Sequence, residues 1–166
     1  MNHEIKQYRV KSEQPTLVRW IVLILLLWLF ALIQAAFLSY VPLFGATIEL
    51  TAAFVLFIAW KRGPLVGGIL GMIGGCLLDA LMGQRISLLA LILFGLGVYA
   101  ALAAKRLFDR PLSYLLMTLP AYVILGVWRA ISMAKFSHVF AVIFVGILAS
   151  LIVYFPTLVK YFRRKS

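Results

Sequence analysis

Cysteine and charged residues are both scarce in this chain. It holds one cysteine, Cys76, among 166 residues, which excludes an internal disulfide and a metal site built from several cysteines. Charged residues make up 13% of the sequence and hydrophobic residues 64%, whereas soluble globular proteins average about 25% charged and roughly 45–50% apolar residues. This composition excludes an ordinary soluble domain. We therefore expect an all-α integral membrane protein.

The hydrophobic residues fall into six runs that predict transmembrane helices. The runs cover residues 17–38, 47–60, 65–82, 88–104, 112–128 and 138–159. Because the connections are too short to hold a soluble domain, we expect a compact six-helix bundle over residues 17–159, a cytoplasmic N-terminal arm over residues 1–16 and a basic cytoplasmic tail over residues 160–166. The second run is short, since roughly fourteen residues rise about 21 Å against a hydrocarbon core of about 30 Å. No cleavable signal peptide is expected, because the first run is long and follows a polar segment.

Lysine and arginine are distributed unequally between the two sides of this predicted bundle. All but three of the sixteen basic residues fall on one side, and the exceptions are Arg85, Arg129 and Lys135. Because basic residues near span ends stay in the cytoplasm, the asymmetry predicts two cytoplasmic termini. The net charge of +11 does not indicate nucleic-acid binding, since the basic residues form short clusters beside apolar runs. Anionic lipid headgroups are the expected counter-charge.

The third run carries a stripe of small residues that ends in an acid. Gly67, Gly71, Gly75 and Asp79 recur every four residues, so they share one face of a helix. Glycine in a helix interior costs about 1 kcal/mol relative to alanine, and in a bilayer such glycines allow close contact between helix backbones. Two interpretations follow: the stripe packs against another helix of this chain, or it docks a partner protein. We predict partner binding through these four residues as the functional interpretation.

Acidic residues inside the predicted spans indicate a polar pocket. Ionisable groups at membrane depth are costly and often functional, and Glu49 and Asp79 lie at comparable depth near the same end of neighbouring runs. We expect a pocket formed by Glu49, Asp79 and Arg85, with Arg129 as an alternative counter-charge. Two simpler interpretations stay open. Glu49 follows Thr47 in the first turn of a helix, where a carboxylate suits the helix dipole, and Asp79 could belong to a structural pair.

The sequence contains no recognisable catalytic set. The two histidines, His3 and His138, are far apart in the sequence and fall on opposite predicted sides of the membrane. The glycines of the third run lack the Lys-Ser/Thr ending of a phosphate-binding loop. We therefore expect no catalytic residues, no metal site, no cofactor and no enzymatic activity.

Residues 71–99 resemble the signature region of the MreD family, small membrane proteins of the bacterial rod-shape system. That region has a glycine-spaced span ending in Leu-Leu-Asp, a short loop with a further glycine, and a second hydrophobic span. The matching residues are, in order, Gly75, Cys76, Leu77, Leu78, Asp79 and Gly83. The chain departs from the family pattern at Ala46, where a proline is frequent, and at Ile86 and Ser87, where Leu-Gly is common.

The resemblance implies a noncatalytic scaffold of the cell-shape (elongation) machinery in the bacterial cytoplasmic membrane. Its expected partners are an MreC-type single-span protein, the peptidoglycan synthases of the elongation complex and, indirectly, MreB filaments. The implied fold is that of the substrate-capture subunits of energy-coupling-factor vitamin transporters. Fold likeness does not transfer activity, but a vitamin-binding subunit is the alternative function. It is suggested by six spans, the outward carboxylates and the small residues Ala31 and Ala35.

Overall fold

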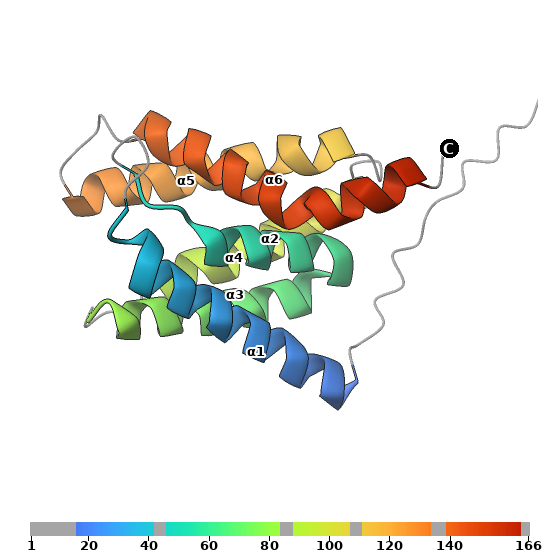
Figure 1. Cartoon of the computed structure of the whole chain (residues 1–166), viewed down its shortest axis with the longest axis horizontal. Coiled ribbons are helices and arrows are strands. Elements are labelled where there is room, and N and C mark those ends of the chain that lie inside the picture. Colours follow the sequence, from blue (N-terminus) through green and yellow to red (C-terminus); the bar gives the residue numbers. More distant parts are fainter. Residues whose placement is uncertain (1–15, 42–45, 84–87, 107–110, 134–138, 164–166) are drawn as a thin grey trace, which may run out of the picture.

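The computed structural model describes residues 16–41, 46–83, 88–106, 111–133 and 139–163. These residues form six α-helices and one short π-helix (Figure 1). The elements are α1 (Leu17–Ile33), η1 (Gln34–Leu38), α2 (Leu50–Arg62), α3 (Pro64–Leu81), α4 (Leu88–Arg106), α5 (Pro111–Met133) and α6 (Val139–Arg163). Residues 1–15 of the predicted N-terminal arm and residues 164–166 of the predicted basic tail lie outside the described residues.

Five of the helical segments are long and apolar enough to cross a membrane. They are Leu17–Leu38, Pro64–Leu81, Leu88–Lys105, Tyr114–Ile131 and Val139–Pro156. The regular structure of the described segments is therefore helical, and the chain is a multi-pass membrane protein, as its composition predicted. The first predicted span agrees with the structure at both ends, because η1 continues α1 as far as Leu38.

The predicted second span differs from the structure. Helix α2 has 13 residues and begins at Leu50, three residues later than expected, so it rises only about 20 Å. It is too short to be counted among the five membrane-spanning segments. Residue Glu49 has φ −85° and ψ 66°, outside the helical region, and ends the non-helical stretch that precedes α2.

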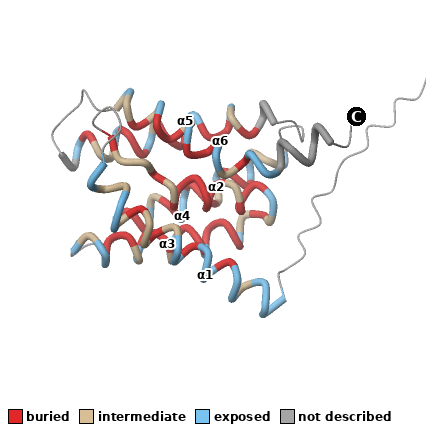
Figure 2. Tube along the Cα trace, viewed as in Figure 1, coloured by how far each residue is buried: buried red, intermediate tan, exposed pale blue. Residues whose placement is uncertain are grey.

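Helix α2 occupies the centre of the bundle. It packs against α1, α3, α4 and α6, and Figure 2 shows it buried along most of its length. Its buried side chains are Thr51, Ala52, Ala53, Phe54, Val55, Leu56, Ile58, Ala59 and Trp60. A helix that is apolar all round needs protein or lipid on every side. Here the other helices provide that cover.

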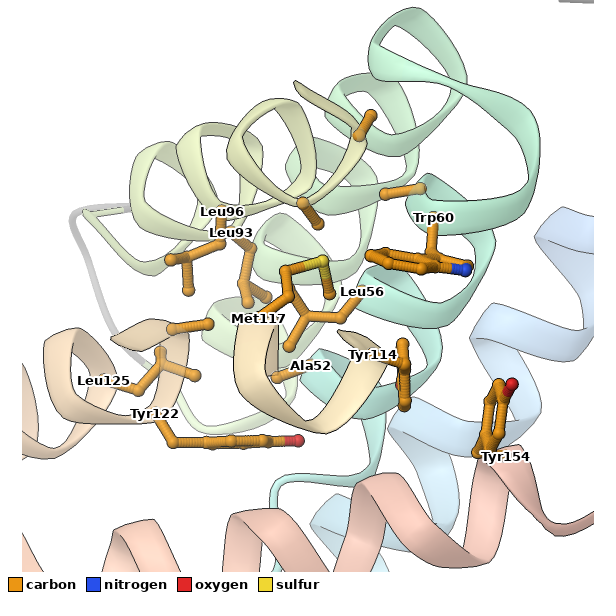
Figure 3. Packing of buried hydrophobic residues seen from close by; sticks show 14 of the residues in the cluster. Ala52, Leu56, Trp60, Leu93, Leu96, Tyr114, Met117, Tyr122, Leu125 and Tyr154 are labelled. Atoms are coloured by element: carbon orange, nitrogen blue, oxygen red, sulfur yellow. The ribbon is translucent and has the colours of Figure 1, made fainter. Parts of the chain in front are cut away.

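Around α2 the helices form layers. Helices α5 and α6 lie side by side on one side of the bundle, and α1 crosses α3 on the other (Figure 1). The core between them contains a group of aromatic rings in which Tyr114 stacks on Tyr154 at 4.7 Å and meets Trp60 edge-on at 5.9 Å (Figure 3). These contacts join α5 and α6 to α2.

The turn between α2 and α3 brings the chain back at one end of the bundle. Gly63 has φ +101°, which glycine adopts without strain, and α3 begins directly afterwards at Pro64. Proline is tolerated there because the first turn of a helix leaves its N–H groups unbonded. The same end of the bundle holds the start of α1 and the end of α6 (Figure 1).

Candidate functional site

A buried polar cluster begins where the first span changes its helical geometry. At η1 the helix widens to a π-helix, and Gln34, its first residue, is fully buried. The Ser39 hydroxyl donates a hydrogen bond of 2.9 Å to the Gln34 backbone carbonyl, which closes this wider turn. Single π turns are rare in helices and frequent at functional sites.

Both the nitrogen and the oxygen of the Gln34 side-chain amide form hydrogen bonds inside the bundle. Its Nε2 group donates to Glu49 Oε2 at 2.8 Å, and its Oε1 atom accepts a hydrogen bond from the Thr51 backbone N–H, also at 2.8 Å. The first N–H groups of a helix have no partner within the helix. The Gln34 side chain therefore caps the N-terminus of α2 from a different helix.

Glu49 completes the cluster with an ion pair. Its Oε1 atom pairs with the guanidinium of Arg129, which comes from α5. The two side chains are 3% and 16% exposed, so the pair is largely withdrawn from solvent. We define the polar cluster as Gln34, Glu49, Thr51 and Arg129. Leaving one partner of such a buried pair alone typically costs about 3–5 kcal/mol.

Apolar contacts cover the non-helical backbone beside this cluster. Ala46 is buried with Val142 and Val145 of α6, and Ile48 packs against the same group. Non-helical backbone at membrane depth is tolerated where protein buries it. The polar cluster and these contacts together tie the segment before α2 to α1, α5 and α6.

The predicted pocket residues have different positions in the structure. Glu49 is paired with Arg129, the alternative counter-charge, while Arg85 lies outside the described residues. Asp79 is 2% exposed near the end of α3. A pocket shared by Glu49 and Asp79 stays a prediction.

The glycine stripe packs inside the chain. A Cβ atom added at Gly71 would overlap the Leu93 carbonyl group of α4, and one at Gly75 would lie 2.5 Å from the Ala90 backbone nitrogen. At Gly67 it would lie 2.9 Å from the carbonyl oxygen of Gly97. The structure therefore supports the first interpretation of the stripe, in which it packs against other helices of the same chain. The predicted docking role of these three glycines is corrected accordingly, because α4, and at Gly67 also Ala59 of α2, already occupies their surface.

Sequence analysis missed several residues of the interior. Gln34 could have been found, since it is an amide within an otherwise apolar run. The Tyr122 hydroxyl lies 3.0 Å from the Ser150 hydroxyl, and the Tyr122 ring lies against Gly146, where a side chain would overlap it. Tyrosine, serine and glycine are common in membrane helices, so no signal in the sequence pairs these three.

The cluster links η1, the start of α2 and α5 through hydrogen bonds and an ion pair, and its positive and negative charges are equal in number. Its carboxylate and guanidinium compensate each other, and its amide is bonded on both sides. Within the described segments, no group of three or more His, Cys, Asp or Glu side chains is placed to hold a metal ion.

Comparisons of the chain with models of protein families, with curated proteins and with solved structures find no match.

Proposed function

We propose that this chain is a noncatalytic membrane scaffold of the bacterial elongation machinery. In this proposal it lies in the cytoplasmic membrane, docks an MreC-type single-span protein and helps organise peptidoglycan synthesis near MreB filaments. The MreD-like residues 71–99 supply the identity of the partners. The structural observation that carries the choice of a scaffold is the polar cluster, in which the side chains of Gln34, Glu49 and Arg129 and the Thr51 backbone N–H are joined by hydrogen bonds and an ion pair.

The polar cluster supports a scaffold more than a vitamin-binding subunit. A small-ligand site needs several polar groups that converge on an enclosed space. Glu49 and Arg129 instead neutralise each other, and Gln34 is bonded to Glu49 and to the backbone of α2. Such bonds fix the relative positions of three segments, which suits a protein whose task is to hold partners.

The proposal includes six membrane crossings with both termini in the cytoplasm. The short α2 supplies about 20 Å of the second crossing, and the four non-helical residues 46–49 can add at most about 14 Å. Together they match a hydrocarbon core of about 30 Å. The α1 start and the α6 end at one end of the bundle agree with this topology (Figure 1).

Co-purification tests the scaffold. The full chain is co-expressed with an MreC-type protein, or with an unrelated single-span protein of matched length as the control, and extracted in mild detergent. We expect a complex with the first protein and none with the second, and rounded cells when the chain is depleted. Equal recovery of both proteins, or rod-shaped depleted cells, would contradict the proposal. Nanomolar calorimetric binding of a vitamin to the purified chain would establish the transporter alternative instead.

A further inference from the structure

The first membrane-spanning segment is the least covered of the five. In Leu17–Leu38, 22% of the most apolar stretch is buried inside the bundle, compared with 33–50% in the other four segments. Its buried residues Leu23, Leu27 and Ala31 lie on the side of α1 that packs against α2 and α3, and α1 lies at the edge of the bundle (Figure 1). Acyl chains can cover an apolar surface, so exposure alone does not identify what lies against the other side.

Trp28 distinguishes this other side from an ordinary lipid-facing surface. It lies at the middle of the 22-residue segment Leu17–Leu38 and is 50% exposed. None of the hydrogen bonds formed by the described residues involves its indole N–H. The other tryptophans lie near segment ends: Trp20 in the first turn of α1, Trp60 in the last turn of α2 and Trp128 in the last turn of the α5 span. Tryptophan favours such ends, where its N–H can meet water or headgroups.

The depth of Trp28 leaves its N–H without an acceptor if only lipid covers it. At about 1.5 Å per residue, Trp28 lies about 16 Å from each end of its segment. This depth corresponds to the centre of a hydrocarbon core of about 30 Å. Acyl chains carry no hydrogen-bond acceptor, and a tryptophan N–H that is withdrawn from water usually has a partner. An acceptor would therefore have to come from protein that lies against α1.

The residues around Trp28 are spaced to receive a second helix. Ile21, Leu25, Trp28 and Leu32 follow one another at intervals of four, three and four residues, so they share one side of α1. Ile21 and Leu25 are 49% and 59% exposed, and Leu32 is half-buried. This seven-residue repeat is that of two helices packed at about 20°. We call these four residues the α1 seam.

A second copy of this chain, paired through the same seam, would not supply the acceptor. Helix α1 (Leu17–Ile33) contains no side chain with an oxygen atom, and the carbonyl groups of a helix are bonded within it. In a symmetric pair the same surfaces meet. Trp28 would then face apolar side chains again, so the acceptor belongs to a different protein.

We infer that the α1 seam docks a transmembrane helix of another protein, which places a Ser, Thr, Asn or Gln side chain opposite Trp28. The side-chain oxygen of that residue accepts a hydrogen bond from the Trp28 indole N–H. Polar side chains of these types bond across helices in membranes. The inference deepens the proposed function and rests on it for the identity of the partner, the MreC-type single-span protein.

A binding titration tests the hydrogen bond. The purified full chain is titrated with a fluorescently labelled MreC-type protein in mild detergent. Trp28→Phe keeps an aromatic ring and removes the N–H, and we expect the affinity to fall about fivefold. The control is Trp20→Phe, the same change at a half-buried residue that packs against the bundle cluster of Leu23 and Leu27. We expect the control to bind like wild type.

Photocrosslinking tests the surface without relying on Trp28. A benzoylphenylalanine is placed at Leu25 of the α1 seam or, as the control, at Leu116 of α5, and each chain is co-expressed with the MreC-type protein. The two positions are 59% and 58% exposed, so they differ in location and not in access. We expect a crosslink to the MreC-type protein from Leu25 and none from Leu116.

The outcomes separate this inference from the proposed function. Absence of any complex with the wild-type chain would refute the proposed function and the partner named here. A wild-type complex with unchanged affinity in Trp28→Phe, or with equal crosslinking from Leu116, would refute the α1 seam alone and leave the scaffold standing. A crosslink from Leu25 to a second copy of this chain, in place of the MreC-type protein, would overturn the choice of occupant.

Discussion

Replacing Gly75 by alanine tests whether close contact between α3 and α4 holds the bundle together. The added Cβ would lie 2.5 Å from the Ala90 backbone nitrogen and 2.9 Å from the Leu89 carbonyl carbon, whereas ordinary contact begins at 3.4 Å. The Ala90 Cα atom would lie closer still, so the two helices must separate locally by at least about 0.9 Å, the difference between 3.4 and 2.5 Å. Because the obstacle is backbone, no side-chain rotation can relieve it. Such overpacking typically costs about 1–3 kcal/mol.

Gly95 provides the matched control. It lies exposed on α4, and a Cβ added there has no described atom within 4 Å outside its own surroundings on the helix. Both substitutions replace a helical glycine by alanine, which favours the helix by about 1 kcal/mol in each case. This gain cancels in the comparison. The difference in free energy of unfolding between the two variants therefore measures the packing cost, about 1–3 kcal/mol.

The assay is unfolding of the purified protein in mild detergent by added dodecyl sulfate, followed by circular dichroism. We expect Gly75→Ala to unfold at a lower denaturant fraction than wild type and Gly95→Ala at an equal or higher one. If Gly75→Ala were as stable as Gly95→Ala, then α3 and α4 would not approach as closely as described. The stripe would then be available to a partner after all.

The same assay checks three further predictions. Glu49→Gln and Arg129→Gln should each lower the free energy of unfolding by about 3 kcal/mol, and their double variant should lose clearly less than the sum; additive losses would mean that the two side chains are not paired. Gly146→Ala should be less stable than Gly95→Ala by about 1–3 kcal/mol, because its Cβ would lie 2.5 Å from Cε1 of Tyr122; equal stability of these two variants would place the ring elsewhere. Gln34→Leu should lower the free energy of unfolding by about 1–3 kcal/mol, because the Glu49 carboxylate and the Thr51 backbone N–H lose their hydrogen bonds to Gln34. An unchanged free energy of unfolding would argue against the capping of α2 by Gln34.

The polar cluster explains how a helix as short as α2 can occupy the centre of a membrane protein. The N-terminus of α2 lies inside the bundle, where lipid could not form hydrogen bonds with the first backbone N–H groups of the helix. The Gln34 side chain satisfies one of them, and the Arg129 guanidinium neutralises the carboxylate that ends the non-helical segment. The same three segments would have to move together in any rearrangement of this part of the protein.

The sequence by itself determined the features that depend on local composition. The apolar run over residues 17–38 gave the first span with its correct ends, because an uninterrupted hydrophobic helix needs only lipid around it. The tight turn before α3 is also a local feature, since it depends on the backbone freedom of Gly63 and on the fixed φ angle of Pro64.

Only the tertiary structure decided which surfaces and charges meet. A glycine stripe can pack equally well against a helix of the same chain or of another protein, and in this structure α4 of the same chain packs against it. Glu49 had two candidate arginines, and the packing of α5 brought Arg129 to it. The start of α2 also depended on distant residues, because Gln34 caps it from another helix. Local sequence fixes which residues prefer lipid or helix, whereas contacts between distant segments depend on how all the helices pack together.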